Sequence, residues 1–193
     1  MLHVYEFNMN FLLKYILITI LFILPVNAEI VKIFEFTETE LNQLKVRKVK
    51  GETKWTLGSN ESGNFIRSEA EGTGSGLGKE ILINLNETPF INITWKVEKN
   101  LSGIIEQSKK GHDFAARVFV VKKTGSTALS NRAVNYVFSS NNKVGKTWTS
   151  PYTKKSIDYV LSTTLDNDNE WVSVKANVKE DFKRLHNLEV SEL

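Results

Sequence analysis

The sequence predicts a mostly β domain, an antiparallel β-sandwich or jelly-roll-like fold with one short helix near its C-terminus. Three observations predict it. Short alternating or β-branched runs recur from Val31 onward, turn residues separate them, and only one late segment has a clear helical period. The 193 residues, of which 41% are hydrophobic and 24% charged, suffice for one globular domain and are too few for two full ones.

The first 28 residues have the pattern of a secretory signal peptide. An apolar run of about 10 residues follows Lys14, and Pro25 precedes a cleavage site of the small-residue type that ends at Ala28. A helix needs roughly 20 apolar residues to cross a bilayer, so the run is short for a span, and an uncleaved anchor is the alternative. We therefore expect residues 1–28 to be removed from an exported protein, periplasmic or extracellular, whose mature domain at 29–193 stays out of the membrane.

The first half of the mature chain alternates expected strands with turns. Thr37 and Glu40 have the spacing of a capping box and predict a brief helical turn. The glycine-dense segment from Gly72 to Gly78 is expected to be a loop with tight turns. Strands are expected at residues 31–36, 55–57, 64–70 and 81–85.

The second half carries the clearest strand patterns and the helix. Strands are expected at residues 90–97, 114–121, 133–139, 157–161 and 171–176. Residues 114–121 are apolar on both faces apart from Arg117, which is typical of a central strand. Asn177 is expected to cap a helix in which Val178, Phe182 and Leu185 share one apolar stripe.

Many ordered motifs between residues 65 and 186 resemble an exported bacterial family, catalogued as domain of unknown function 3047. They are Ser68-x-Ala70-x-x-x-Gly74-Ser75-Gly76-Leu77, Thr88-Pro89, Trp95-Lys96-Val97, Asp113 to Val121, Arg132 to Ser140, Pro151-Tyr152-Thr153, Trp171-Val172 and Asn177-Val178-x-x-Asp181-Phe182. The resemblance implies an exported, sandwich-like β domain without an established activity.

The chain departs from that family pattern at two places. The family has two consecutive acidic residues where this chain has His112-Asp113. Family members also continue beyond the helix into further strands, whereas this sequence ends at Leu193. From this difference we expect a C-terminally incomplete domain whose open sheet edge favours self-association.

Composition excludes several kinds of chemistry. The absence of Cys excludes disulfides, thiolate zinc sites, iron–sulfur clusters and cysteine nucleophiles. A net charge of +3 is too small to indicate a nucleic-acid partner. The Gly72–Gly78 segment lacks the Lys-Ser/Thr of a phosphate loop, and the acidic turn at 166–170 lacks the spacing of a calcium loop. No cofactor and no metal is therefore expected.

A candidate ligand site is built around Arg117, the one charged residue of an otherwise apolar strand. Asp113 and Asn135 are expected to be its polar partners, and Trp148 with Tyr152 offers stacking surface from a later loop. Together they would form a small polar pocket with an aromatic wall, as many sugar sites do. The same residues could instead form an internal ion pair beneath packed aromatic rings.

Three functions are compatible with this inventory. The first is a non-catalytic binding module for a glycan or another envelope component, which export, a β-sandwich and loop aromatics favour. The second is a structural or assembly protein of the cell envelope whose sheet edge pairs with a partner strand. The third is a hydrolase or lyase that uses Asp113 and Arg117.

Overall fold

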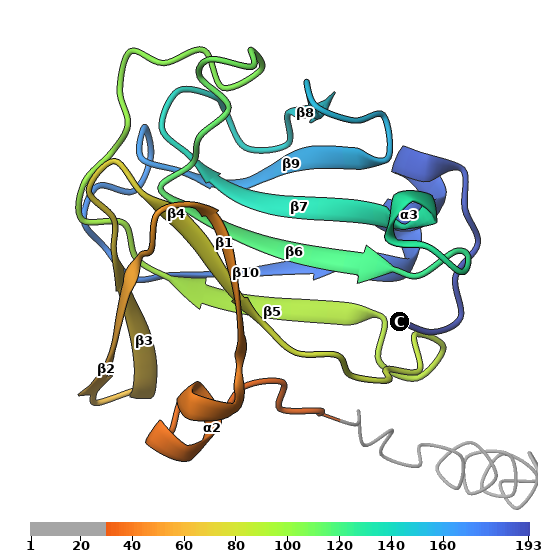
Figure 1. Ribbon diagram of the computed structural model, residues 1–193, viewed down its shortest axis with the longest axis horizontal. Helices are drawn as coiled ribbons and strands as arrows, with labels where there is room; N and C mark the ends of the chain where they lie inside the picture. Colours follow the sequence, from red (N-terminus) through yellow and green to blue (C-terminus); the bar gives the residue numbers. More distant parts are fainter. Residues whose placement is uncertain (1–29) are drawn as a thin grey trace, which may run out of the picture.

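The structure, a computed structural model, describes residues 30–193, and strands dominate it (Figure 1). The predicted signal peptide, residues 1–28, lies outside the described residues. The elements are α2 (Glu38–Gln43), β1 (Lys45–Lys50), β2 (Lys54–Asn60), β3 (Gly63–Glu69), β4 (Gly74–Gly78), β5 (Phe90–Trp95), β6 (Ala116–Lys122), the 3₁₀ turn η1 (Ala128–Ser130), β7 (Arg132–Ser139), β8 (Thr147–Thr149), β9 (Ser156–Thr163), β10 (Val172–Asn177) and α3 (Val178–His186). The predicted fold class, mostly β with a short C-terminal helix, is confirmed.

Two sheets form the layers of the sandwich, by which we mean β5 to β10 together with α3. One sheet has four strands in the order β6-β7-β9-β8, and the other pairs β10 with β5. Every pair is antiparallel except β7 and β9, which run parallel. Parallel neighbours need a long connection, and here it is the segment 140–155, which contains β8.

The core lies between the two sheets and follows the predicted alternation. Tyr136 and Phe138 of β7 are fully buried and face Ile93 and Trp95 of β5 within one apolar cluster. The indole Nε1 of Trp95 donates a 2.8 Å hydrogen bond to Ser162 Oγ of β9, so its polar atom is satisfied inside the core.

Helix α3 closes one end of this core, as its sequence predicts. Asn177 Oδ1 accepts a 3.1 Å hydrogen bond from the Glu180 N–H and caps the first turn. Phe182 is fully buried in the same apolar cluster. The helix ends at Asn187, which adopts the left-handed conformation that asparagine tolerates (φ 50°).

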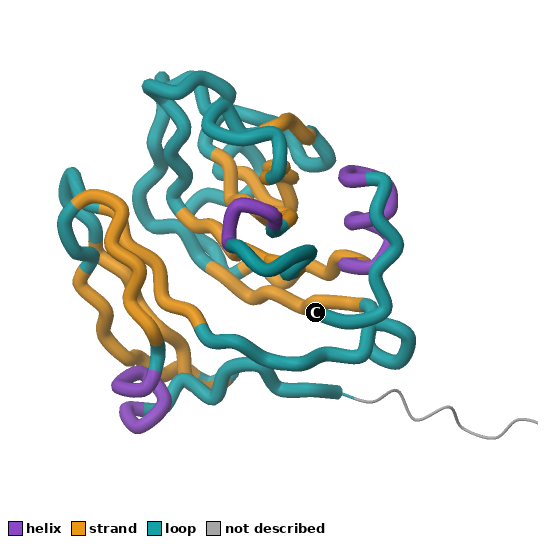
Figure 2. The backbone as a smooth tube through the Cα atoms, turned by 45° about the vertical axis from the view of Figure 1, so that its right-hand side comes forward, coloured by secondary structure: helices purple, strands orange, loops and turns teal. Residues whose placement is uncertain are grey.

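A second unit, the hairpin unit, comprises α2 and β1 to β4 (residues 38–78) and stands to one side of the sandwich (Figure 2). Strands β2 and β3 cover the expected strands at 55–57 and 64–70 and form a hairpin. Thr37 Oγ1 accepts the Glu40 N–H at 3.2 Å, and the Glu40 carboxylate accepts the backbone N–H groups of Glu35 and Phe36, so the predicted helix start is confirmed.

Two expectations about this part of the chain are wrong. Residues Val31–Phe36 form no strand, since no other segment pairs with them among the described residues. The glycine-dense segment is not a loop, because Gly74–Gly78 is strand β4 and pairs with Lys45–Lys50. Glycine has a low strand propensity, and here the pairing partner determines the structure.

The segment Ile81–Leu85 is also not a regular strand. It makes a short ladder with the end of the chain: Ile83 and Leu193 exchange backbone hydrogen bonds of 3.3 and 3.0 Å, and the Leu85 N–H donates to Ser191 O at 2.8 Å. No helix within residues 30–193 combines the length and the apolar character that crossing a bilayer needs.

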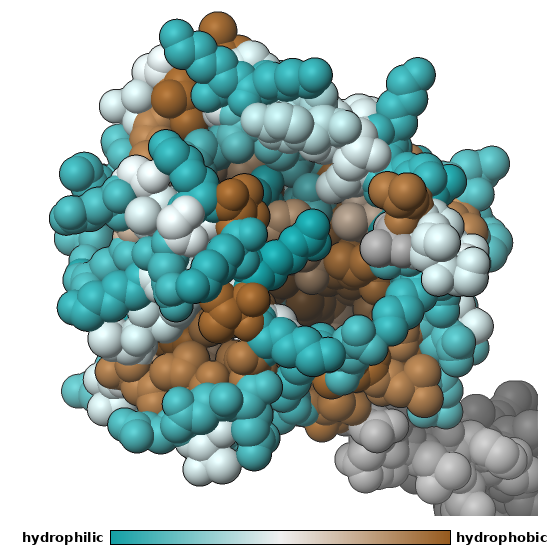
Figure 3. All heavy atoms as spheres, in the orientation of Figure 1, coloured by the Kyte–Doolittle hydropathy of each residue, from teal (hydrophilic) through white to brown (hydrophobic). Residues whose placement is uncertain are grey.

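The predicted central strand lies at an edge. Strand β6 begins at Ala116 and pairs only with β7, so its other edge has no partner within residues 30–193. Phe119 is 54% exposed and Val121 is 45% exposed on this edge strand. Figure 3 shows apolar residues around a hollow in the middle of the view, where β5, β6 and β10 lie in Figure 1. The prediction of a central strand is therefore wrong. Apolar residues on both faces of a strand occur here in an edge strand as well.

Candidate functional site

The predicted site residues gather on the outer face, which we define as the face of the four-stranded sheet turned away from β5 and β10. Strand register places Phe119, Asn135, Asp158 and Trp148 in one row across β6, β7, β9 and β8. Arg117 lies two residues before Phe119 on the same face of β6 and pairs with Val137 of β7. Because paired residues share a face of a sheet, four separate segments of the chain meet here.

A buried polar network lies beneath this face. Asp158 is 0% exposed, and the two oxygens of its carboxylate accept hydrogen bonds from His112 Nε2 and Asn135 Nδ2, both at 2.8 Å. Asn135 Nδ2 also donates to Ser156 Oγ at 2.7 Å. An ionised carboxylate accepts from the His112 tautomer that carries its hydrogen on Nε2.

Asn135 lies below the surface and does not line it. The residue is 1% exposed, and its Oδ1 has no hydrogen-bond partner within the described part of the chain. A buried acceptor without a partner costs about 1–3 kcal/mol. Asn135 was predicted to contact the ligand, whereas the geometry gives it the task of holding Asp158, and through it His112, in place.

Aromatic rings connect this network to the surface. The Phe114 ring packs edge-on to His112 with centroids 5.3 Å apart and stacks on Trp148 at 6.1 Å. Tyr152 packs edge-on to His112 at 5.5 Å, donates its hydroxyl to Lys109 O at 2.7 Å and is 65% exposed. The rings of His112 and Phe114 thus link Trp148 and Tyr152, which the sequence predicted as a pair.

Trp148 supports the aromatic wall more than it presents a free ring. It is half-buried, packs against the cluster of Phe114, Val137 and Val160, and its buried Nε1 has no hydrogen-bond partner within residues 30–193. The predicted stacking surface is therefore provided by Tyr152 and Phe119, the two rings with the larger exposure.

Arg117 lies between two rings. Its guanidinium carbon is 5.1 Å from the Phe114 centroid and 4.4 Å from the Phe119 centroid, distances typical of cation–π contacts. Burial lowers the pKa of Arg117 below its usual value, while the charges of Asp158 and Asp113 act in the opposite direction.

The predicted ion pair between Asp113 and Arg117 does not form. Strand β6 begins at Ala116, so Asp113 belongs to the preceding loop and the alternation that would place both side chains on one face does not reach it. Its own backbone N–H donates to Gly111 O at 2.7 Å, and its Oδ1 accepts from the Phe114 N–H at 2.9 Å. The carboxylate is therefore turned back onto its loop, with the residue exposed.

A buried glutamate holds the loop that carries His112. Glu106 is 0% exposed and accepts hydrogen bonds from Ser139 Oγ, from the Ser140 N–H at 2.8 Å and from Asn142 Nδ2 at 2.6 Å. These donors lie at the end of β7 and just after it. The loop at 101–113 is thereby fixed to the sheet, so His112 and Tyr152 approach one another on a rigid support.

Sequence reasoning missed three of the residues that build this site. His112 was noted only as a departure from the family pattern, although its neighbour Asp113 was selected. Asp158 had a usable signal, because it is the single charged residue of the predicted strand at 157–161, as Arg117 is of the predicted strand at 114–121. Glu106 lies in an irregular loop, where no pattern distinguishes a buried carboxylate from a solvated one.

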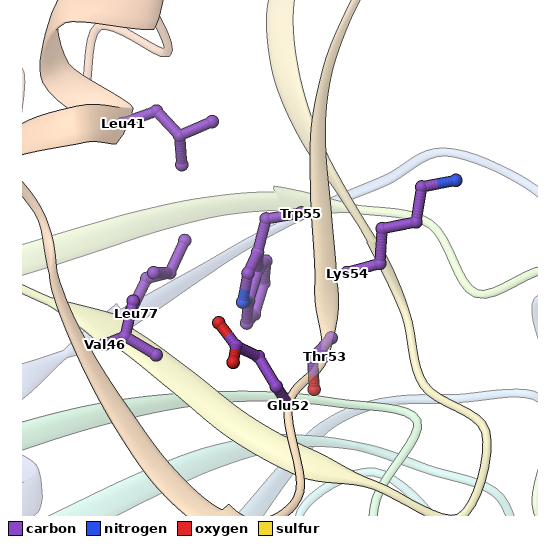
Figure 4. Close-up of a pocket in the computed structure, with 7 residues that line it drawn as sticks. All are labelled: Leu41, Val46, Glu52, Thr53, Lys54, Trp55 and Leu77. Atoms are coloured by element: carbon purple, nitrogen blue, oxygen red, sulfur yellow. The ribbon is translucent and has the colours of Figure 1, made fainter.

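The hairpin unit has a hollow of its own, of about 440 Å³ (Figure 4). Leu41, Val46, Leu77 and Trp55 give it an apolar wall, and the Glu52 carboxylate points into it. None of the predicted site residues lines it. The outer face of the sandwich therefore remains the candidate site.

The chain was compared with protein-family models, with curated proteins and with solved structures, and only a family model matches it. No curated protein and no solved structure matches the chain. The family model described as "Protein of unknown function (DUF3047)" matches residues 39–193, which include both the hairpin unit and the outer-face residues. This match covers most of the chain and agrees with the resemblance found in the motifs, so the protein belongs to the DUF3047 family.

Proposed function

We propose that this protein is an exported, non-catalytic binding module for a glycan or another component of the cell envelope, and that its ligand docks on the outer face. The observation that carries the proposal is the exposure of two rings on this face: Tyr152, which packs against the buried His112 ring, and Phe119, which packs against the Arg117 guanidinium. Exposed rings beside a few polar groups are a usual arrangement for binding sugars, whose C–H faces stack on aromatic surfaces.

Rigidity of the support favours binding over a structural role for these rings. His112 is fixed by Asp158, its loop is fixed by Glu106, and Tyr152 is fixed through its hydroxyl. A preorganised surface loses little conformational entropy when it binds. An exposed tyrosine held in this way is therefore well suited to stack on a ligand.

The test is a glycan-array screen of residues 29–193, followed by titration of the best ligand with two matched variants. Tyr152→Ala should weaken binding about tenfold, which corresponds to about 1.4 kcal/mol, with little change in melting temperature because the ring is largely exposed. Phe90→Ala is the control, since Phe90 is a 48% exposed ring on the other sheet. Equal affinity of both variants and the wild type would place the ligand elsewhere, and a blank array would remove glycans as the ligand class.

A second candidate function is assembly through the open edge of β6. The observation that favours it is an unpaired, apolar edge strand with Phe119 and Val121 exposed, a template onto which a partner strand can add. The partner we expect is β6 of a second copy. Val121→Lys should then shift the protein toward monomer in size-exclusion chromatography with light scattering.

Val144→Lys is the matched control for that experiment. Val144 is also about half exposed, at 54%, but it lies in the loop before β8, away from the edge. If the wild type is monomeric at high concentration, or both variants change its association equally, pairing through β6 is wrong.

A further inference from the structure

The guanidinium of Arg117 has donors without acceptors. No carboxylate lies within 4 Å of it, and no hydrogen bond joins it to another group within residues 30–193. Both oxygens of Asp158 are engaged by His112 and Asn135, and Asp113 is turned toward its own loop. A guanidinium presents five N–H donors in a planar fork and stays charged at any physiological pH. The rings of Phe114 and Phe119 lie against it, and rings do not use up its N–H groups, which are left to bind an acceptor.

The loops that frame the outer face concentrate positive charge. Residues 101–113 and 141–155 contain six lysines (109, 110, 143, 146, 154 and 155) against two acidic residues, although the whole chain has 25 basic and 22 acidic residues. One of these two acids, Glu106, is buried and engaged. The two loops lie side by side at the top of Figure 1, where Tyr152 joins them through Lys109. The field at this surface therefore favours an anionic ligand.

We propose that the outer face binds an acidic polysaccharide of the uronic-acid type, with Arg117 as the residue that binds the sugar carboxylate. This inference rests on the proposed function and narrows its ligand class. In this proposal Phe119 and Tyr152 stack on the sugar rings. Arg117, which contacts Phe114 and Phe119, binds the negative charge of the sugar carboxylate.

Geometry favours a carboxylate attached directly to a sugar ring. A carboxylate is planar and accepts two parallel hydrogen bonds from a guanidinium edge. In a uronic acid this group is bonded to the pyranose ring itself, so ring and charge occupy neighbouring positions. On the protein, an exposed ring and the guanidinium are likewise adjacent, with 4.4 Å from the Phe119 centroid to the Arg117 carbon.

The experiment titrates the protein, residues 29–193, with oligogalacturonate, oligoglucuronate and oligomannuronate. Each is paired with its carboxyl-reduced counterpart, which has the same linkage and no charge. At least one acidic oligosaccharide should bind about tenfold or more tightly than its neutral counterpart. If no acidic form exceeds its neutral partner, the inference is overturned, whereas the proposed function stands as long as a neutral glycan binds. A protein that binds no glycan at all overturns the inference and removes glycans from the proposed function, which then rests on another envelope component.

Three variants then test the role of Arg117. Arg117→Met should reduce the affinity for the acidic oligosaccharide to that of the neutral one. Arg117→Lys keeps the charge beside Asp113 and Asp158, and thus protects the fold, but lacks the fork and should still lose about tenfold. Lys154→Gln is the control. It removes a positive charge from an exposed residue of the loop at 141–155 and should change the affinity less than about threefold.

The variants also define the results that contradict the inference. Circular dichroism and melting curves establish that each variant is folded before it is titrated. A folded Arg117→Lys variant that binds the acidic oligosaccharide as tightly as the wild type overturns the assignment. An equal loss of affinity in Lys154→Gln and in Arg117→Lys also overturns it, because binding then depends on the total positive charge and not on Arg117. Arg117-dependent binding of a phosphorylated glycan, with no uronate bound, also overturns it.

Discussion

The hairpin unit and the sandwich are both built of β-strands, but different forces hold them together. All buried residues of the apolar cores belong to the chain from Leu85 to Val190. In the hairpin unit, β1 is exposed along its whole length and α2 has no buried residue. Strand pairing and surface ion pairs such as Lys48–Glu52 and Lys54–Glu69 hold the hairpin unit instead. Such ion pairs contribute little, so we expect the sandwich to carry most of the free energy of unfolding.

Two contacts join the hairpin unit to the sandwich. Arg67 of β3 makes a two-point hydrogen bond with the Glu98 carboxylate at 2.8 and 2.6 Å. Phe65 of β3 packs edge-on against Trp171 with ring centroids 5.1 Å apart. The candidate site lies on the sandwich, supported by its core. From this difference we expect the candidate site to depend on the sandwich and the hairpin unit to open separately from it.

The largest effect is expected from Phe182→Ala. Phe182 is fully buried in α3, and removing a buried phenylalanine ring costs about 3–5 kcal/mol. Chemical denaturation followed by intrinsic fluorescence should show this loss. Val49→Ala in β1, where Val49 is 81% exposed, is the control and should stay within about 0.5 kcal/mol. Similar losses in the two variants would show that the hairpin unit shares the core.

The second effect is expected from Glu106→Ala, which acts on the site from within the sandwich. The change leaves donors of Ser139, Ser140 and Asn142 without their acceptor, at about 1–3 kcal/mol for a buried donor that stays unsatisfied. Hydrogen exchange should become faster in the loop at 101–113 and remain slow in β7. Unchanged exchange in that loop would mean that other contacts, such as Tyr152 with Lys109, are enough to hold it.

The sequence predicted the sandwich better than the hairpin unit, and the reason is physical. In β5 and β10 the side chains alternate between the core and the solvent side, so burial imposes the period of two that the sequence displays. Gly74–Gly78 has no core to face, and only its pairing with β1 makes it a strand. Long-range pairing leaves no local signal, so this strand and the edge position of β6 could not be predicted.

The same contrast applies to the candidate site. Arg117 and Asp158 are charged residues within apolar strands, a pattern visible in sequence, although only Arg117 was selected. The partner of Asp158 was not predictable, because His112 reaches it from a loop 46 positions away. Asp113 was chosen as the partner of Arg117 on strand periodicity, and this failed because the strand begins only at Ala116.

A smaller effect is expected from Trp171→Ala at the contact between the two parts. The edge-on pair with Phe65 contributes about 0.5–1.5 kcal/mol. Because this ring joins the hairpin unit to the sandwich, hydrogen exchange in β2 and β3 should accelerate while β7 and β9 keep their protection. Phe90→Ala, which removes a similarly exposed ring from β5, is the control. Faster exchange in all four strands would show that the two parts unfold together.

The smallest effect is expected from a change of pH, because the sandwich contains histidines and the hairpin unit does not. His186 lies in α3, where burial lowers its pKa below the usual 6.5; its hydrogen bond to the Ala133 carbonyl opposes this, and Arg132 adds to the lowering. A base with a lowered pKa binds its proton more weakly in the folded state than in the unfolded state. Its contribution to stability is therefore complete above pH 6.5 and is lost as pH falls through the lower, folded-state pKa.

No histidine lies in the hairpin unit, residues 38–78, so mild acid should weaken only the sandwich. Between pH 7 and pH 5, exchange in β7 should accelerate while exchange in β2 and β3, corrected for its intrinsic pH dependence, stays constant. The His186→Gln variant should reduce the dependence in β7, since glutamine does not titrate. An unchanged slope in that variant would show that His186 is not the source of the acid sensitivity.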